Sequence, residues 1–328
     1  MADVGNEADP KPEIVMLNIN VGILGHVDSG KTSLVRALST QLSTASLDKS
    51  PQSRARGMTM DLGFSSFDVP MPAHLAEAAA AASRANRLQF TLVDCPGHAG
   101  LIKTIIGGAQ IIDMMVLVID VNKGIQTQTA ECLVIGEITT DNMIVALNKC
   151  DLLPAEPAAR AAALAAASTK VRAALASTRF ANAPFVPVAG SVAAAGFDSE
   201  QYASEGLPAL CDALLSQTRL PQRSSAGNLL YAVDHCFAVK GQGTVLTGTV
   251  LRGELRVGQI VEVPQLRVAK KVKSIQMFRK QVKSAMQGDR AGICVPGLDA
   301  SLVERGIVAE PGEFIWLPLH FTRILLTI

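Results

Sequence analysis

Eight residues near the start of the chain have the spacing of a loop that holds phosphate groups. Residues 25–32 read G-H-V-D-S-G-K-T, which fits the pattern G-x-x-x-x-G-K-T. Glycines let the backbone approach phosphate oxygens, Lys31 can reach the β- and γ-phosphates, and the Thr32 hydroxyl can bind Mg²⁺. The predicted phosphate-binding residues are His26, Val27, Asp28, Ser29, Gly30, Lys31, Thr32 and Ser33.

The segments on either side of this loop have the patterns of a strand and a helix. Residues 14–24 are largely apolar and β-branched, which predicts a buried strand, and residues 33–38 predict the start of a helix. This order places the N–H groups and the positive dipole end of the helix at the phosphates. A chance glycine-rich turn, which is the alternative, does not account for both flanks.

A carboxylate and a histidine follow a second predicted strand. After residues 88–93 the chain reads D-C-P-G-H from Asp94 to His98. The Asp94 carboxylate can hold a water of Mg²⁺, and the N–H of Gly97 can contact a terminal phosphate. For Asp94 taken alone, a helix cap is the simpler alternative.

A motif that can recognise a base follows a third strand. Residues 148–151 read N-K-C-D directly after the apolar run 143–147. The Asp151 carboxylate can accept hydrogen bonds from two adjacent N–H donors of guanine, whereas adenine would leave it unpaired. A turn carboxylate is the simpler alternative. Together, and each at a strand end, the three motifs predict a switch protein that binds and hydrolyses GTP.

The pattern of strands and helices divides the chain into parts. Strands alternate with helices in the first two thirds, which predicts an α/β domain with a parallel sheet covered on both faces. Short β-branched runs separated by glycine turns follow, among them 268–277, and predict an antiparallel β-barrel. We therefore predict a disordered N-terminus 1–13, a P-loop GTPase domain 14–220, a linker 221–228, a β-barrel domain 229–305 and a divergent tail 306–328.

Three further segments of the first domain predict secondary structure but carry no functional motif. Residues 64–69 alternate between apolar and polar and predict an edge strand. Residues 73–87 are Ala-rich, and we interpret them as a family-variable insertion; a solvated helix without function is the preferred reading. Residues 155–176 predict a second Ala-rich helix on the surface.

Composition excludes several classes of protein. The chain has 328 residues, of which 48% are hydrophobic, and a formal net charge of +1, so no general attraction to nucleic acid or membrane is expected. Its six cysteines are scattered without metal-ligand spacing, which favours reduced core residues in a cytoplasmic protein. The apolar runs, such as 114–119, are too short to span a bilayer.

The motifs and their order resemble translational GTPases of the elongation factor Tu type, from residue 14 to about residue 305. Three further stretches resemble the eukaryotic selenocysteine-specific elongation factors rather than the general factor: 45–57 (ASLDKSPQSRARG), 233–237 (VDHCF) and 284–294 (SAMQGDRAGIC). The resemblance implies a GTPase that carries selenocysteyl-tRNA to the ribosome at recoded UGA codons. The alternatives are another translational GTPase, or a truncated paralogue that binds GTP without delivering tRNA.

The resemblance assigns roles in the nucleotide site residue by residue. It implies that Thr59 closes over Mg²⁺, which Thr32 binds directly and Asp94 binds through a water. His98 matches the histidine that positions the attacking water, which phosphoryl transfer needs more than covalent help. Val27 and Met58 match the apolar residues that screen this histidine. The implied guanine site consists of Asn148, Lys149 and Asp151 with Ala189 and Gly190 of the last loop. That loop reads V-A-G-S at 188–191 and lacks the family's lysine.

A second implied site lies on the barrel. Asp234, His235 and Arg290 match the family's proposed selenocysteine pocket. A selenol is more acidic than a thiol, so selenocysteine is largely an anion at neutral pH, whereas serine is neutral. Arg290 and His235 can favour the anion, with Asp234 orienting them. The alternative is that Asp234 and His235 cap a strand and that Arg290 pairs with Asp289 on the surface.

The resemblance also implies cofactors and partners. The cofactors are GTP and Mg²⁺, and the partners are selenocysteyl-tRNA and the ribosome. A further C-terminal domain would meet a selenocysteine-insertion RNA element or its binding protein. We expect a cytoplasmic monomer that does not bind membranes. The basic run 270–273 can meet RNA phosphates or form a solvated strand face. The tail 306–328 departs from the family and is expected to be the start of a missing second barrel in a truncated product.

Overall fold

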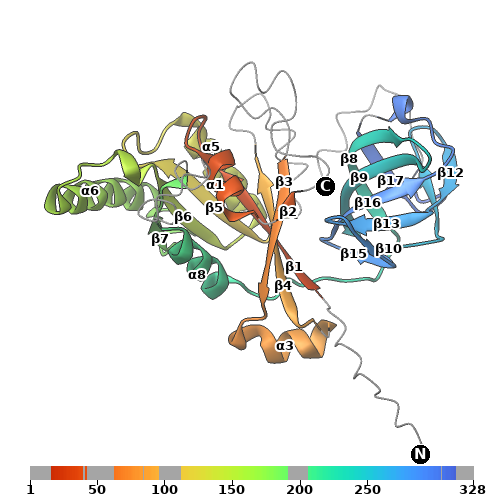
Figure 1. Cartoon of the computed structure of the whole chain (residues 1–328), viewed down its shortest axis with the longest axis horizontal. Coiled ribbons are helices and arrows are strands. Elements are labelled where there is room, and N and C mark those ends of the chain that lie inside the picture. The colour runs from red at the N-terminus through yellow and green to blue at the C-terminus, as the bar shows by residue number, and fades with distance from the viewer. Residues whose placement is uncertain are drawn as a thin grey trace, which may run out of the picture.

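A computed structural model describes residues 16–39, 41–42, 63–83, 85–95, 112–190, 206–303 and 305–314. Two bodies of structure lie side by side in Figure 1, an α/β domain and a barrel of short strands. Within the described residues, no helix is both long enough and apolar enough to cross a bilayer.

The first domain is built on a seven-stranded sheet in the order β2-β3-β4-β1-β5-β6-β7. The strands β4, β1, β5, β6 and β7 are parallel, and β3 and β2 continue the sheet in antiparallel fashion. The bounds are β1 Met16–Leu24, β2 Gln41–Leu42, β3 Gly63–Pro70, β4 Arg87–Asp94, β5 Met114–Asp120, β6 Met143–Asn148 and β7 Phe185–Pro187. The predicted edge strand 64–69 is therefore wrong in position: β3 is the second strand from the edge, because β2 pairs with its outer side.

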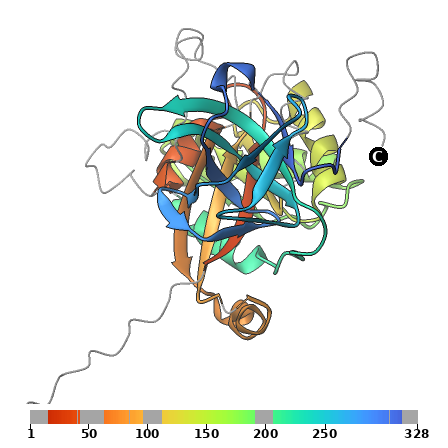
Figure 2. The same ribbon diagram turned by 90° about the vertical axis from the view of Figure 1, so that its right-hand side faces the viewer.

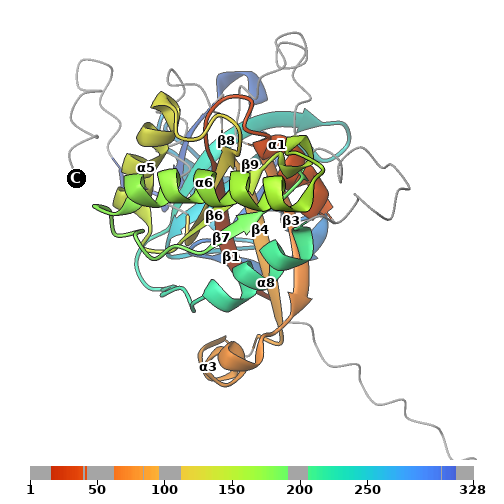
Figure 3. The same ribbon diagram turned by 90° about the vertical axis from the view of Figure 1, so that its left-hand side faces the viewer.

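Helices cover both faces of this sheet, as predicted from the continuous apolar runs of its strands. One face packs against α5 (Thr127–Thr139) and α6 (Pro157–Leu175), and the other against α1 (Lys31–Leu38) and α8 (Leu207–Gln217). Figure 3 shows α6 and α8 on the side of the domain away from the barrel. The carboxyl ends of β1, β4 and β6 carry the three motifs, so the sheet itself brings them together.

The Ala-rich segment between β3 and β4 contains the helix α3 (Ala73–Ser83). Figure 1 shows it at the far end of the β3–β4 pair. Leu75 and Ala79 are its buried residues among those described, and most of its other described side chains are exposed. This placement at the opposite end of β4 from Asp94 separates α3 from the motifs.

The second domain contains an eight-stranded sheet in the order β12-β11-β17-β8-β9-β16-β13-β14 and a two-stranded sheet of β10 and β15. The antiparallel pairing confirms the predicted barrel architecture, and Figure 2 shows this domain face-on. The bounds are β8 Leu230–Val239, β9 Gly243–Arg252, β10 Glu254–Arg256, β11 Ile260–Val263, β12 Val268–Lys271, β13 Ser274–Met277, β14 Lys280–Val282, β15 Ser284–Met286, β16 Arg290–Val295 and β17 Gly306–Ala309.

The structure differs from the predicted barrel in two places. The run 268–277 forms two strands, because β12 pairs with β11 whereas β13 pairs with β16. The chain changes partner at Val272 and Lys273, whose N–H groups donate to opposite neighbours. The strand β17 pairs with β8 and β11, so the barrel sheet extends beyond residue 305 into the segment assigned to the tail.

Polar contacts join the two domains near β1. The side-chain amides of Asn18 and Asn20 both donate to the carbonyl oxygen of Gly288, at 3.1 and 2.8 Å. Arg223, in the predicted linker, pairs with Asp113 at 2.5 Å. Because these groups are largely buried, the contacts fix how the barrel sits against the first domain.

Candidate functional site

The loop after β1 has the backbone conformation that its glycines permit. Gly25 and Gly30 have φ of 151° and 89°, in the region that side chains rarely adopt. A Cβ on Gly25 would lie 2.3 Å from the carbonyl oxygen of Val118, so no larger residue fits there. The N–H of Ser29 donates to the carbonyl of His26 at 3.2 Å, which closes the turn.

Lys31 begins α1 and points back into this loop. Its Nζ donates to the carbonyl oxygens of Gly25 and His26 at 3.0 and 2.7 Å. Burial lowers the pKa of Lys31, while the nearby charge of Asp94 opposes that shift. Among the described residues, no side chain caps the N-terminus of α1. A buried ammonium and an uncapped helix N-terminus together form an anion site.

The carboxyl end of β4 brings a hydroxyl and a carboxylate together. The Oγ1 of Thr32 donates to Oδ2 of Asp94 at 2.7 Å, and Asp94 is fully buried. The N–H of Cys95 donates to the carbonyl of Ile23, which holds the end of β4 against β1. A hydroxyl and a carboxylate side by side are the oxygen groups that suit Mg²⁺ or its bound water.

Asn148 connects the phosphate loop to the last loop of the predicted guanine site. Its Nδ2 donates to the carbonyl of Ser29 at 2.8 Å, and its Oδ1 accepts from the N–H of Gly190 at 2.9 Å. Ala189 and Gly190 are buried, and a Cβ on Gly190 would lie 3.1 Å from the Cα of Leu34. The side chain of Asn148 thus positions the backbone of this loop, which lacks the family's lysine.

Asp151 presents an unsatisfied acceptor at the same edge of the sheet. It lies in a short 3₁₀ turn, Cys150–Leu152, that the left-handed residue Lys149 (φ 66°) introduces. Its Oδ1 is buried, and within the described residues it has no hydrogen-bond partner. A buried carboxylate oxygen without a donor fits a guanine that supplies the missing N–H groups.

Two residues of this site escaped the sequence analysis. Oδ2 of Asp120 lies 2.9 Å from Nζ of Lys149, and Oε1 of Gln128 accepts the N–H of Val27 at 3.0 Å. Asp120 ends β5 and lies opposite Asn148 in the parallel register, so its strand-end position was a usable signal. Nothing in the local sequence of α5 distinguishes Gln128.

Some predicted site residues lie outside the described residues. They are Met58, Thr59, Gly97 and His98. Their roles as gate, Mg²⁺ ligand, phosphate contact and catalytic histidine stay predictions. Val27, the other predicted gate residue, is described and half-buried.

The barrel brings its three predicted pocket residues together around one carboxylate. Asp234 of β8 pairs with Arg290 of β16, lies 3.3 Å from Nδ1 of His235, and accepts from Oγ1 of Thr247 at 2.9 Å. Burial pushes the pKa of Asp234 upward, but the charge of Arg290 and the contacts with His235 outweigh it and lower the pKa to about 2. The alternative pairing of Arg290 with Asp289 on the surface is wrong, because Arg290 is buried beside Asp234.

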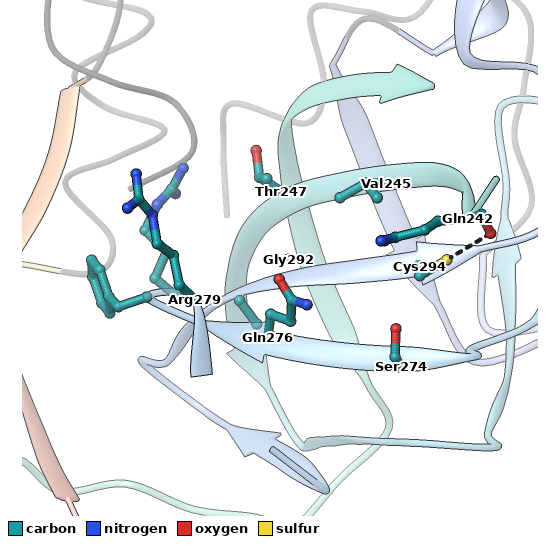
Figure 4. Close-up of a pocket in the computed structure, with 11 residues that line it drawn as sticks. Gln242, Val245, Thr247, Ser274, Gln276, Arg279, Gly292 and Cys294 are labelled. Atoms are coloured by element: carbon teal, nitrogen blue, oxygen red, sulfur yellow. Dashed lines mark hydrogen bonds between the residues drawn. The ribbon is translucent and has the colours of Figure 1, made fainter. Parts of the chain in front are cut away.

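The two basic side chains beside Asp234 line different hollows. Arg290 lines a small cavity of about 60 Å³ together with Thr247, Gln276 and Cys294. Figure 4 shows Thr247, Gln276 and Cys294 on three different strands around this cavity. The Cys294 thiol points toward the backbone oxygen of Gln242. His235 lines a wider hollow of about 520 Å³. A ligand in either hollow would lie close to a basic side chain that Asp234 contacts.

Family comparison matches both domains. The first match is the elongation factor Tu GTP binding domain, over residues 16–238, and the second is elongation factor Tu domain 2, over residues 243–309. The chain belongs to the elongation factor Tu GTP-binding family. The match confirms the predicted GTPase fold, and its second part includes β17.

Curated relatives of the family match most of the chain. The chain is 56% identical over 295 residues, 90% of its length, to a selenocysteine-specific elongation factor from Mus musculus. It is 35% identical over 296 residues, 89% of its length, to a selenocysteine-specific elongation factor from Methanocaldococcus jannaschii. These alignments cover 49% and 56% of the two relatives, so the chain spans about half of their length.

Solved structures of the family have the same fold. A bacterial selenocysteine-specific elongation factor aligns with a TM-score of 0.72 at 27% identity, covering 90% of this chain and 45% of the other. The translation elongation factor SelB from Methanococcus maripaludis, in complex with the GTP analogue GppNHp, aligns with a TM-score of 0.71 at 27% identity, covering 92% of this chain and 56% of the other.

Proposed function

We propose that this chain binds GTP and Mg²⁺, hydrolyses GTP, and uses this switch to deliver selenocysteyl-tRNA to the ribosome at recoded UGA codons. The observation that carries the proposal is the 56% identity, over 90% of the chain, to a mouse protein named as a selenocysteine-specific elongation factor. The geometry of the described nucleotide-site residues supports GTP binding independently of this sequence identity.

In this proposal the phosphates lie over the loop at 26–33. Lys31 would exchange its two carbonyl partners for phosphate oxygens, and the N-terminus of α1 would supply N–H donors. Thr32 would bind Mg²⁺ directly and Asp94 through a water, with Thr59 completing the set. Mg²⁺ neutralises charge that develops on the phosphates during transfer.

Guanine recognition would use the edge formed by Asn148, Lys149 and Asp151. The buried Oδ1 of Asp151, without a partner among the described residues, would accept from the base. The backbone of the loop at Ala189 and Gly190 would lie next to the guanine oxygen, and Oδ1 of Asn148 holds that loop in place by accepting the N–H of Gly190. This loop lacks a lysine whose stem would stack on the base, so we expect it to contact guanine through its backbone.

Hydrolysis would depend on His98 orienting the attacking water. Val27 and Met58 would screen the histidine until the ribosome acts. The N–H of Val27 is held by Gln128 of α5, which supports a fixed position for this side of the gate. Orienting a water accelerates phosphoryl transfer without covalent participation.

Selection of selenocysteine would rest on its negative charge. Arg290 and His235 present positive or hydrogen-donating groups; Asp234 pairs with Arg290 and lies 3.3 Å from Nδ1 of His235. A neutral serine on the same tRNA gains nothing from this charge, whereas a selenolate does. The buried setting strengthens the discrimination, because charges interact more strongly away from water.

The proposed partners are selenocysteyl-tRNA and the ribosome. The longer relatives contain further chain beyond the aligned part, and such a segment would be the contact for a selenocysteine-insertion RNA element or its binding protein. We propose a cytoplasmic monomer.

The test compares aminoacyl forms of one tRNA. The chain loaded with GppNHp is mixed with the same tRNA carrying either selenocysteine or serine, and protection of the ester bond from hydrolysis is measured. We expect the selenocysteyl ester to be protected at lower protein concentration. Equal protection of both esters would contradict the selenocysteine assignment. GTP binding is tested separately with Lys31→Ala, which we expect to lose it.

A further inference from the structure

One side chain of α5 is bonded to the backbone of the phosphate loop. Oε1 of Gln128 accepts a hydrogen bond from the N–H of Val27 at 3.0 Å. Gln128 lies in the first turn of α5, whereas Val27 lies in the loop between β1 and α1. Both residues are half-buried. A hydrogen bond that is partly shielded from water stabilises the conformation in which it forms.

A second residue of α5 faces the same loop. Cys132 follows Gln128 by four residues, so the two side chains lie about one helical turn apart on one face of the helix. Burial raises the pKa of the Cys132 thiol to about 11, whereas the charge of Lys31 and the N–H of Gly25 oppose this shift. The opposition by Gly25 shows that its N–H is directed at the thiol. One face of α5 therefore meets the loop at Gly25 and again at Val27.

The loop contains a residue whose backbone conformation is costly. Asp28 directly follows Val27 and has a φ of 61°, in the left-handed region that residues with a side chain rarely adopt. Such a conformation persists where the surrounding structure imposes it. The hydrogen bond from Gln128 fixes the position of the residue before Asp28. It therefore acts where the backbone of the loop is under strain.

The helix that carries Gln128 is firmly seated on the sheet. Leu133 and Ile135 of α5 are buried in the core of this face. A Cβ on Gly136 would lie 2.8 Å from Sδ of Met115 on β5, so the helix packs closely against the strand. A group on such a helix holds its partner more precisely than a group on a loop does.

We propose that Gln128 is a positioning residue of the phosphate loop, and that it keeps the strained turn at Val27 and Asp28 ready to receive a nucleotide. The proposal rests on the proposed function, since that function gives the loop its ligand. Without Gln128 the loop relaxes toward less strained conformations, and nucleotide binding must restore the original one. Because Gln128 acts on the loop rather than on one phosphate group, its loss weakens GDP and GTP by the same factor.

The first test removes the hydrogen-bond acceptor. Gln128→Leu lacks Oε1 and keeps a side chain of similar size. The 328-residue parent and variant are titrated with fluorescent derivatives of GDP and GppNHp. We expect the Kd of the variant to be about threefold to tenfold higher for both nucleotides, as the loss of one hydrogen bond predicts. The ratio of the two Kd values should stay within about twofold of the parent's ratio.

The matched control is the same substitution two residues earlier on the helix. The backbone N–H of Gln126 donates to Oγ1 of Thr129 at 3.3 Å, and among the described residues Gln126 has no hydrogen bond to the phosphate loop. Gln126→Leu should therefore leave both Kd values within about twofold of the parent. Melting temperatures measured in parallel show that each variant is folded at the temperature of the titration.

A second variant removes the donor instead of the acceptor. Replacing Val27 with its α-hydroxy analogue converts the amide N–H into an ester oxygen and keeps the side chain. This change should weaken both nucleotides. Adding Gln128→Leu to the ester protein should cause no further loss, because the hydrogen bond is already absent. The ester also weakens the carbonyl of His26 as an acceptor, but this effect is common to both ester proteins and cancels.

Several results would overturn the proposal. They are parent-like affinities in Gln128→Leu, an equal loss in Gln126→Leu, a loss confined to GppNHp, and additive losses in the ester protein with Gln128→Leu. Failure of the proposed function has a different signature, because the parent chain would then bind neither nucleotide or would fail to distinguish the two aminoacyl-tRNAs.

Discussion

The ammonium of Lys149 lies 2.9 Å from the carboxylate of Asp120, at the ends of two adjacent parallel strands. Lys149 has a left-handed backbone and precedes the turn that carries Asp151. Asp120 is 5% exposed, and its pKa is lowered because Lys149 and backbone N–H groups outweigh the effect of burial. The pair therefore fixes the direction in which the lysine leaves the strand.

The Asp120–Lys149 pair predicts a residue that contributes to nucleotide affinity without being needed for chemistry. Asp120→Asn should weaken GDP and GTP by about fivefold to twentyfold, because a hydrogen bond to a charged group is worth about 1.5–3 kcal/mol and the amide keeps part of it. Hydrolysis at saturating GTP should be unchanged. The control is Asp141→Asn, which removes the exposed pair of Asp141 with Arg219 at 3.4 Å. Equal affinities for parent and Asp120→Asn would show that Lys149 needs no such support.

Nucleotide choice should depend on Asp151. Asp151→Asn should weaken GTP by about a hundredfold or more and favour xanthosine triphosphate, because the amide can donate to the oxygen that replaces the amino group of guanine. Competition between the two nucleotides for the same variant measures this reversal. A variant that still prefers GTP would place base recognition on other groups.

Binding and hydrolysis should separate at two residues. Lys31→Ala should lose nucleotide binding, since Lys31 is the buried cation of the phosphate loop. His98→Ala should keep GTP binding and lose most ribosome-stimulated hydrolysis, by about three orders of magnitude or more, as expected when a water loses its orientation. Single-turnover hydrolysis with and without ribosomes distinguishes them. Equal loss of binding in both variants would give His98 a structural role.

Selectivity on the barrel should depend on charge. His235→Ala and Arg290→Ala should each reduce the preference for selenocysteyl- over seryl-tRNA by about tenfold, because each removes a group that favours the anion. The comparison is made at saturating GTP, so that any effect of Arg290 on nucleotide affinity does not enter. If both variants retained the parent's preference, the pocket would have to lie away from Asp234.

The arrangement of the three motifs at one edge of the sheet was predictable, because they follow the ends of parallel strands. Apolar runs located β1, β4 and β6, and the sheet then brought their carboxyl ends to one edge. The role of Asn148 as a bridge between Ser29 and Gly190 was not predictable, since those contacts join residues far apart in the chain. Asp120 was missed although it ends a predicted strand, and Gln128 was missed because a lone polar residue on a helix carries no spacing signal.

The barrel was less predictable for a physical reason. Short antiparallel strands alternate partners, so an apolar run does not reveal where one strand ends and the next begins. The first part of the run 268–277 pairs with β11 and the second part pairs with β16. The strand β17 lies in a segment where the sequence pattern predicted no strand. The contact of Arg290 with Phe64 depends on how the two domains meet, which no local pattern encodes.

The last prediction concerns pH and the domain interface. Burial raises the pKa of Asp289 from 3.8 to about 6, although the N–H of Met286 and the charge of Arg223 oppose the shift. The folded state therefore binds a proton more tightly than the unfolded state between about pH 4 and pH 6. Stability should fall as pH rises through this window, and the ionised carboxylate should cost stability above pH 6.

Replacing Asp289 with asparagine removes this cost and keeps an oxygen that can accept from Met286. At pH 7.5 we expect the melting temperature of Asp289→Asn to exceed that of the parent by about 2–5 °C. The difference should shrink as pH falls below 6, because the parent then becomes protonated as well. Burial also raises the pKa of Asp113, but this group is common to both proteins and cancels in the comparison. Asp141→Asn is the exposed control and should show no such pH dependence; a difference for Asp289→Asn that stayed constant from pH 4.5 to pH 8 would contradict the raised pKa.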